Sequence, residues 1–238
     1  MEGESEWPND AYWRALVDGE RFVVDDQLYV SQVVDCGELV VPTGRLVACD
    51  PFAAMRRGGN PAISIPPGRY PVKVTLLDVS GRGDGSHIRE AYASLLLGDR
   101  AEVTRRELVA RRFPDEPVPG SAPDEFNGFP VDAGTACFVD DGALVYGMPP
   151  REGWYDTLFD NGEPTSWFAL MDDPGHIRRG IANIPLPLAR DGANIVVIHS
   201  GWGDGIYPLV GGYDATGELV AVHIDFYVAP EPEDDDSV

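Results

Sequence analysis

The segment GANIVVIHSGWGDGIYPLVGGYDATGELVAVHIDF, residues 192–226, decides the fold. Three runs rich in β-branched and aromatic residues, 194–199, 206–213 and 218–227, alternate with connections rich in glycine. Runs of this composition, bounded by Gly, Asn and Asp, are typical of β-strands. The DATG connection at 214–217 has the composition of a hairpin turn. We therefore predict a meander of three antiparallel strands in this segment.

The rest of the chain repeats the same strand and turn signals. We predict further strands within the ranges 21–34, 37–52, 62–79, 86–99 and 129–147. The Asp140-Asp141-Gly142 sequence has turn composition, and we predict a hairpin turn there. Residues 101–126 are rich in Arg and Pro and are predicted to form a loop. Thr165 or Ser166 is expected to cap a short helix.

These signals predict a mainly β protein, α+β at most. The architecture we expect is an antiparallel β-sandwich or an open barrel built of meanders, with one or two short helices, because turns recur too often for βαβ units. We expect a single β-rich domain over residues 1–228. The tail at 229–238 contains five acidic residues and two prolines and is expected to be disordered.

The charge balance restricts the class of partner. Forty acidic residues against eighteen basic ones give a net charge of −22, which repels nucleic-acid phosphate and anionic lipid. We therefore expect neither nucleic acid nor membrane as a partner, and we expect a basic protein. The chain has no apolar run long enough to span a membrane, and its acidic N-terminus lacks a secretory signal.

The cysteines give no indication of a metal or disulfide framework. Cys36, Cys49 and Cys137 are scattered, odd in number and form no CxxC motif. We expect them to be buried free thiols, and we expect a cytoplasmic protein without cofactor or metal.

A near-repeat raises a question about function. SGRGDG stands at 80–85 and SGWGDG at 200–205. The glycines permit tight turns, and the Asp side chains can accept hydrogen bonds from neighbouring backbone N–H groups, so each copy is predicted to connect adjacent strands. The second copy also presents aromatic residues on a stiff turn, which suits a recognition surface. The candidate binding residues are Trp202, Asp204 and Tyr207, with Arg82 and Asp84 from the first copy.

Two alternatives remain open from the residues. One is a ligand-binding or hydrolytic domain, with Asp84, Asp204, His199 and His223 lining a pocket near the two loops. The other is a structural domain stabilised by calcium at Asp84 or Asp204. No GxSxG nucleophile motif is present, and we assign no catalytic residue.

The chain resembles a bacterial family, the domain of unknown function 4241. The specific part is the pattern SGxGDGxYP followed by G, D, G and DF, carried by Ser200, Gly201, Gly203, Asp204, Gly205, Tyr207, Gly212, Asp214, Gly217, Asp225 and Phe226. Weaker matches are PPGRYPVKV, TGRLVACDPF and VDAGTACFVDD, so that the resemblance covers about residues 37–227. It implies a soluble bacterial cytoplasmic protein, of a kind that occurs as immunity partners of toxins. The hypothesis is therefore a non-enzymatic acidic protein-binding domain, an immunity or inhibitor protein for a basic bacterial toxin or enzyme.

Overall fold

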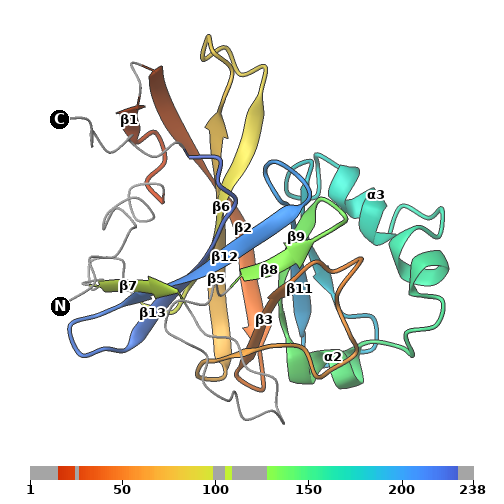
Figure 1. The fold of residues 1–238 in the computed structure, drawn as a ribbon. Helices are drawn as coiled ribbons and strands as arrows, with labels where there is room; N and C mark the ends of the chain where they lie inside the picture. The colour runs from red at the N-terminus through yellow and green to blue at the C-terminus, as the bar shows by residue number, and fades with distance from the viewer. Residues whose placement is uncertain (1–15, 25–26, 99–104, 109–127, 230–238) are drawn as a thin grey trace.

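The computed structural model describes residues 16–24, 27–98, 105–108 and 128–229. Two open antiparallel sheets make up most of this part of the chain, and short helices lie beside the smaller sheet (Figure 1). The predicted mainly β, sandwich-like architecture is confirmed, and neither sheet closes into a barrel within the described residues. Among the helices described, none is long and apolar enough to cross a membrane.

The larger sheet has eight strands. In spatial order they are β1 (Arg21–Val24), β2 (Gln27–Val41), β5 (Gly68–Asp78), β6 (Ile88–Leu96), β13 (Leu219–Asp225), β12 (Gly205–Tyr213) and β7 (Arg105–Leu108), and β8 (Gly128–Val131) also pairs with β12. The β5–β6 and β12–β13 pairs are hairpins, as the sequence predicts.

The smaller sheet has five strands and is covered on one face by helices. Its order is β10 (Ile181–Pro185), β11 (Asn194–His199), β9 (Thr135–Asp140), β3 (Arg45–Cys49) and β4 (Ile63–Ser64). The described helices are α2 (Asp141–Gly147), the π-helical turn η2 (Tyr155–Phe159) and α3 (Trp167–Asp172). These are three short helices where the sequence led us to expect one or two. Ser166 caps α3 by accepting a hydrogen bond from the Ala169 N–H, as predicted.

The smaller sheet is buried on both faces, and this explains its composition. On β11, Val196 and Ile198 belong to the core that also contains residues of the larger sheet. Their neighbours Ile195 and Val197 belong to a second core, shared with the helices. Since successive side chains of a strand point to opposite faces, a strand covered on both sides is apolar throughout. The continuous apolar run at 195–198 is therefore the mark of a central strand.

The predicted three-stranded meander is wrong at its first connection. Strand β11 is paired on both edges, with β10 and with β9, and has no free edge for β12. The chain therefore leaves the smaller sheet after His199 and enters the larger sheet at Gly205. SGWGDG is a crossing between two sheets, whereas SGRGDG is the hairpin loop between β5 and β6.

The sequence predicts a hairpin turn at Asp140-Asp141-Gly142, and this prediction is wrong. These residues form the start of helix α2. The Asp140 carboxylate is completely buried and caps the helix, accepting from the Ala143 N–H at 2.8 Å. It also accepts from the Thr43 N–H at 2.9 Å and from the Thr43 hydroxyl at 2.7 Å. One carboxylate thus joins the helix start to residues 42–44, where the chain first crosses between the sheets.

Two further predictions fall largely on residues outside the described ranges. Within 101–126 the structure describes the strand β7, so part of the predicted loop is a strand. The remainder of that region and the predicted tail, except Ala229, lie outside the described residues. The single domain over 1–228 stays a prediction.

The three cysteines are free and buried, as predicted, and we expect them to be unreactive. Burial raises the pKa of Cys36 to about 12, and burial raises that of Cys137 well above its usual value. Since the thiolate is the nucleophile, iodoacetamide at about pH 8 should label none of the three in the native protein. Mass spectrometry should show three additions after unfolding in guanidinium. Labelling of the native protein at the unfolded rate would contradict the described burial.

Candidate functional site

The crossing loop 200–205 is closed by its own hydrogen bonds. The Gly203 carbonyl oxygen accepts from the Ser200 hydroxyl at 2.7 Å and from the Tyr207 hydroxyl at 2.8 Å. The Gly203 N–H in turn donates to the Ser200 carbonyl at 3.1 Å. The loop therefore keeps one shape and presents its exposed side chains in fixed positions.

Gly201 presses this loop against the larger sheet. Its φ is 59°, and a Cβ atom there would lie 2.7 Å from the Glu90 carbonyl oxygen and 2.7 Å from Val228 Cγ2. The Gly201 carbonyl accepts a hydrogen bond from Arg89 Nη1 at 3.3 Å. Only glycine combines this backbone conformation with such a close approach.

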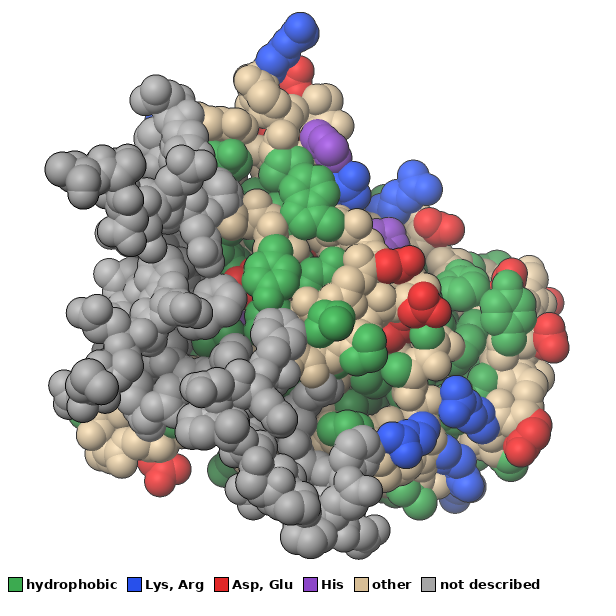
Figure 2. Space-filling view, viewed as in Figure 1, with side chains coloured by type: hydrophobic (Ala, Val, Ile, Leu, Met, Phe, Trp, Pro, Cys, Tyr) green, Lys and Arg blue, Asp and Glu red, His purple; other side chains and the backbone are tan. Residues whose placement is uncertain are grey.

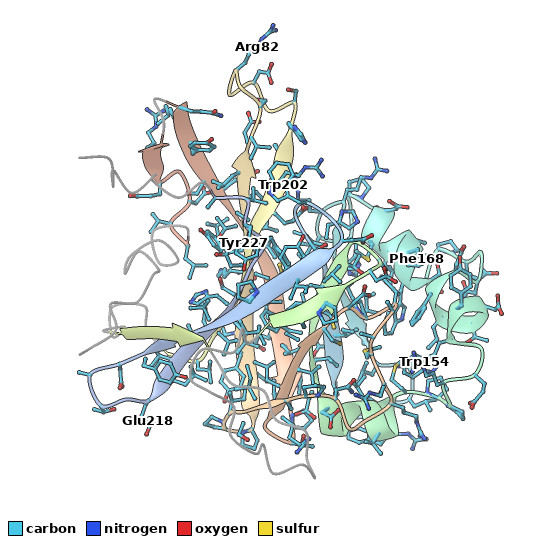
Figure 3. The ribbon with its side chains drawn as sticks, viewed as in Figure 1. Arg82, Trp154, Phe168, Trp202, Glu218 and Tyr227 are labelled. Atoms are coloured by element: carbon cyan, nitrogen blue, oxygen red, sulfur yellow. The ribbon has the colours of Figure 1, made fainter. Side chains whose placement is uncertain are left out.

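Three exposed apolar side chains lie around this loop. Trp202, Ile206 and Tyr227 are 52%, 59% and 44% exposed, and we call them the apolar surface. Figure 2 shows hydrophobic side chains gathered near the centre of this face with acidic side chains beside them, and Figure 3 places Trp202 and Tyr227 close together. Trp202 Nε1 donates to the Tyr227 carbonyl at 2.9 Å, and the Arg89 guanidinium lies 5.5 Å from the Trp202 ring centre.

Tyr227 has a backbone conformation that side chains seldom adopt. Its φ of 54° makes it the one non-glycine residue with positive φ among those described. The Asp225 carboxylate holds it there by accepting from the Tyr227 N–H at 2.8 Å. Such strain is maintained only where the surroundings determine it, and it is concentrated at functional sites.

The structure places the predicted residues of the second loop in different environments. Trp202 is on the surface. Asp204 connects the loop to a neighbouring turn, because its Oδ1 accepts from the Gly134 N–H at 3.0 Å. Tyr207 is only 3% exposed, packs edge-on against Phe226 and has a pKa raised by burial. Tyr207 therefore supports the loop from below and does not form part of its surface.

The predicted residues of the first loop form a separate turn. Asp84 accepts from the Ser86 N–H at 3.1 Å, and hydrogen bonds to Ser86 and Ser80 lower the pKa of its carboxyl. Asp78, which the sequence did not single out, accepts from the Ser80 and Gly85 N–H groups. Arg82 lies at the tip of the hairpin, beyond Trp202 (Figure 3). The structure thus does not bring Asp84 and Asp204 together.

A pocket lies beside the crossing loop, next to Ala133 and His199. His199 is one of the histidines singled out from the sequence. The pocket has a volume of about 660 Å³ and lies where α3 meets the ends of β9 and β11. His199 lines it, but Asp84, Asp204 and His223 do not. His223 is buried in the larger sheet and hydrogen-bonded to the Ser94 hydroxyl at 2.8 Å.

The part of the chain that the structure describes holds no group of three or more His, Cys, Asp and Glu side chains able to bind a metal ion. The calcium alternative stays a prediction that nothing in this geometry favours.

Sequence reasoning missed Arg89, Tyr227 and the pocket residue Thr135. Arg89 could have been noticed as a charged residue in a strand, but its position on Trp202 depends on contact between distant segments. Nothing in the sequence signals the positive φ of Tyr227. Thr135 lies in the pocket because it is directly paired with His199 on the adjacent strand.

Comparison with known protein families gives a match over most of the chain. The family model described as "Protein of unknown function (DUF4241)" matches residues 39–224. The matched region runs from β2 to β13 and so contains strands of both sheets and the crossing loop. No curated protein and no solved structure matches.

Proposed function

Since the chain belongs to the family described as a protein of unknown function (DUF4241), we propose its function from its own surface and charge. We propose that it is a non-enzymatic binding protein whose apolar surface docks on a basic partner protein. The observation that carries this proposal is the rigid, exposed group of Trp202, Ile206 and Tyr227 in a chain of net charge −22.

The side chains of the apolar surface suit an interface. Trp and Tyr are enriched among the residues that dominate binding energy, because they bury a large area at little cost in conformational entropy. The hydrogen bond from Trp202 to the Tyr227 carbonyl and the contact with Arg89 hold the indole in place before a partner arrives. A preorganised surface binds more tightly because less freedom is lost on association.

The charge supports the choice of a basic partner. An excess of 22 negative charges accelerates encounter with a cationic protein, and salt screens this effect. Within this class, the finer proposal is an inhibitor or immunity protein for a basic bacterial toxin or enzyme, acting in the cytoplasm. The free, buried cysteines are compatible with that reducing compartment.

Trp202→Ala is expected to weaken partner binding at least tenfold, because it removes the central anchor. The tagged protein would be used to capture partners from lysate of the source organism at about 50 mM salt, and the affinity of the captured protein would then be measured. A basic protein should be captured whose affinity falls at about 500 mM salt.

The controls use two aliphatic residues of similar exposure. Ile206→Arg places a positive charge in the apolar surface, whereas Leu188→Arg places it at a 52%-exposed residue outside that surface. We expect the first substitution to abolish capture and the second to preserve it, with thermal melting confirming that each variant is folded. Equal capture by the wild type and Trp202→Ala, or binding insensitive to salt, would refute the proposal.

A further inference from the structure

The floor of the pocket beside the crossing loop is made by two residues from adjacent strands. Thr135 of β9 and His199 of β11 are directly paired, so their side chains share one face of the sheet. This is the face that carries Cys137 and Val197 and is covered by the helices further along the strands. The pocket lies between this pair and helix α3, since Phe168, Ala169, Met171 and Asp172 of the helix also line it.

Thr135 has an unused polar group in this pocket. The residue is only 5% exposed, and its hydroxyl has no hydrogen-bond partner among the described residues. A buried hydroxyl without a partner is unfavourable, and in a native protein it often marks the place of a ligand or a bound water. As an oxygen with two lone pairs, it can accept a hydrogen bond from an N–H donor.

His199 adds a second acceptor. Loss of solvation lowers its pKa, an effect that the nearby Asp172 opposes and Arg179 and Arg89 reinforce. This lowered pKa favours the neutral imidazole, which has one nitrogen that can accept a hydrogen bond.

The walls and rim are aromatic and acidic. The rings of Phe52 and Phe168 meet edge-on with their centres 4.6 Å apart, and both line the pocket (Figure 3 labels Phe168). The carboxylates come from Asp160, Glu163 and Asp172. No lysine or arginine is among the described residues that line the pocket.

The carboxylates remain available to a ligand. Asp172 pairs with Arg179 at 3.5 Å, but both side chains are largely exposed, and an exposed pair of this kind exchanges readily with water. The described carboxylates do not come close enough together with other ligating groups to form a metal site. Acidic groups spread around a rim with aromatic walls suit an extended organic cation better than a metal ion.

We propose that this pocket binds an alkylammonium or guanidinium group, with the carboxylates neutralising its charge, the phenylalanine rings contacting its apolar part, and Thr135 and His199 accepting its hydrogen bonds. The group belongs either to a free organic amine or to a lysine or arginine side chain of a bound protein. The second source is compatible with the position of the pocket beside the crossing loop, since Ser200 N–H donates to the Gly134 carbonyl at 3.1 Å at their border. Trp202, Ile206 and Tyr227 do not line the pocket, so binding of a cation there does not require binding of a protein to the apolar surface.

Calorimetric titration of the full chain with agmatine, which carries both an ammonium and a guanidinium group, tests the proposal. We expect a Kd below about 1 mM for agmatine and no binding up to about 10 mM of butane-1,4-diol, which has the same four-carbon chain with an uncharged polar group at each end. Titration with the N-acetyl methylamides of lysine and of arginine separates the two sources. Binding of either one equal to that of agmatine indicates a protein side chain, and much weaker binding of both indicates a free amine.

Variants connect the binding to the pocket. Glu163→Gln should raise the Kd for agmatine about fivefold to tenfold, whereas Glu218→Gln, at an exposed hairpin far from Phe168 in Figure 3, should leave it within about twofold. Thr135→Val keeps the shape of the side chain and should weaken agmatine binding without lowering the melting temperature, which a purely structural role of the hydroxyl would not explain. Absence of agmatine binding to the wild type, or an identical Kd for wild type and Glu163→Gln, would overturn the proposal.

Discussion

Asp140→Ala is expected to lower the free energy of unfolding by about 3–5 kcal/mol. The buried carboxylate accepts from the N–H and hydroxyl of Thr43 and from the Ala143 N–H, and a weaker bond of 3.4 Å comes from the Arg45 N–H. Alanine leaves these donors without an acceptor in a place that water does not reach, and it removes the cap of α2 as well. Urea unfolding followed by tryptophan fluorescence measures the change.

The matched control for this variant is Asp214→Ala. The Asp214 carboxylate also accepts three hydrogen bonds, from the N–H and hydroxyl of Thr216 and from the Glu218 N–H, but it lies in an exposed hairpin turn. Water can replace the lost acceptor there, so the loss should be much smaller. Equal losses for the two variants would show that burial of Asp140 is not the cause.

Gly201→Ala is expected to cost about 2–4 kcal/mol of stability and to disturb the apolar surface. The new methyl group would lie 2.7 Å from a backbone oxygen of β6, which moves only with its strand. The positive φ adds about 1–2 kcal/mol for a residue with a side chain. The loop can relieve the overlap by moving outward, and Trp202 then loses its contact with Arg89. Thermal unfolding and the partner affinity described above should therefore both change.

Gly203→Ala separates the effect of steric overlap from that of backbone conformation. Gly203 also has a positive φ, 97°, but a Cβ atom there would meet nothing within 4 Å. We expect Gly203→Ala to lower the free energy of unfolding only by the cost of the positive φ, and Trp202 should keep its contacts. If Gly203→Ala destabilises as much as Gly201→Ala, the close contact with β6 does not determine the shape of the loop.

Local features could be predicted from the sequence because they depend on neighbouring residues. The Ser166 cap and the DATG turn at 214–217 each need only a few adjacent side chains to specify them. Which sheet a strand joins depends on distant segments. The two connections of segment 192–226 have similar turn composition, yet one crosses between sheets and the other closes a hairpin. The unbroken apolar run at 195–198, before the loop 200–205, was the sign in the sequence that this strand is covered on both faces.

The candidate site was predictable only in part for the same reason. The sequence indicated the loop that carries Trp202, since glycine, aspartate and aromatic residues occur together there. It did not indicate that Tyr207 would point inward, because both Tyr207 and Ile206 are compatible with either face of a strand. The pocket depends on the pairing of Thr135 with His199, 64 positions later, which no local pattern encodes. The helix after Asp140 was the more avoidable error, since Asp is a common N-cap residue and the helix-forming residues Ala143 and Leu144 follow it before Gly147.

The order of the larger sheet has a consequence for how the protein is made. Strand β6 pairs with β5 on one edge and with β13 on the other, where Leu96 faces Ala221 and Tyr92 faces Asp225. At a synthesis rate of ~5–20 residues per second, a ribosome needs roughly 6 to 26 seconds to produce β13 after β6 has been made. During that time the nascent chain carries an open strand edge next to an apolar surface, the feature most prone to pairing with other chains. The interval between synthesis of β6 and synthesis of β13 is therefore the period in which the nascent chain is most exposed to pairing with other chains.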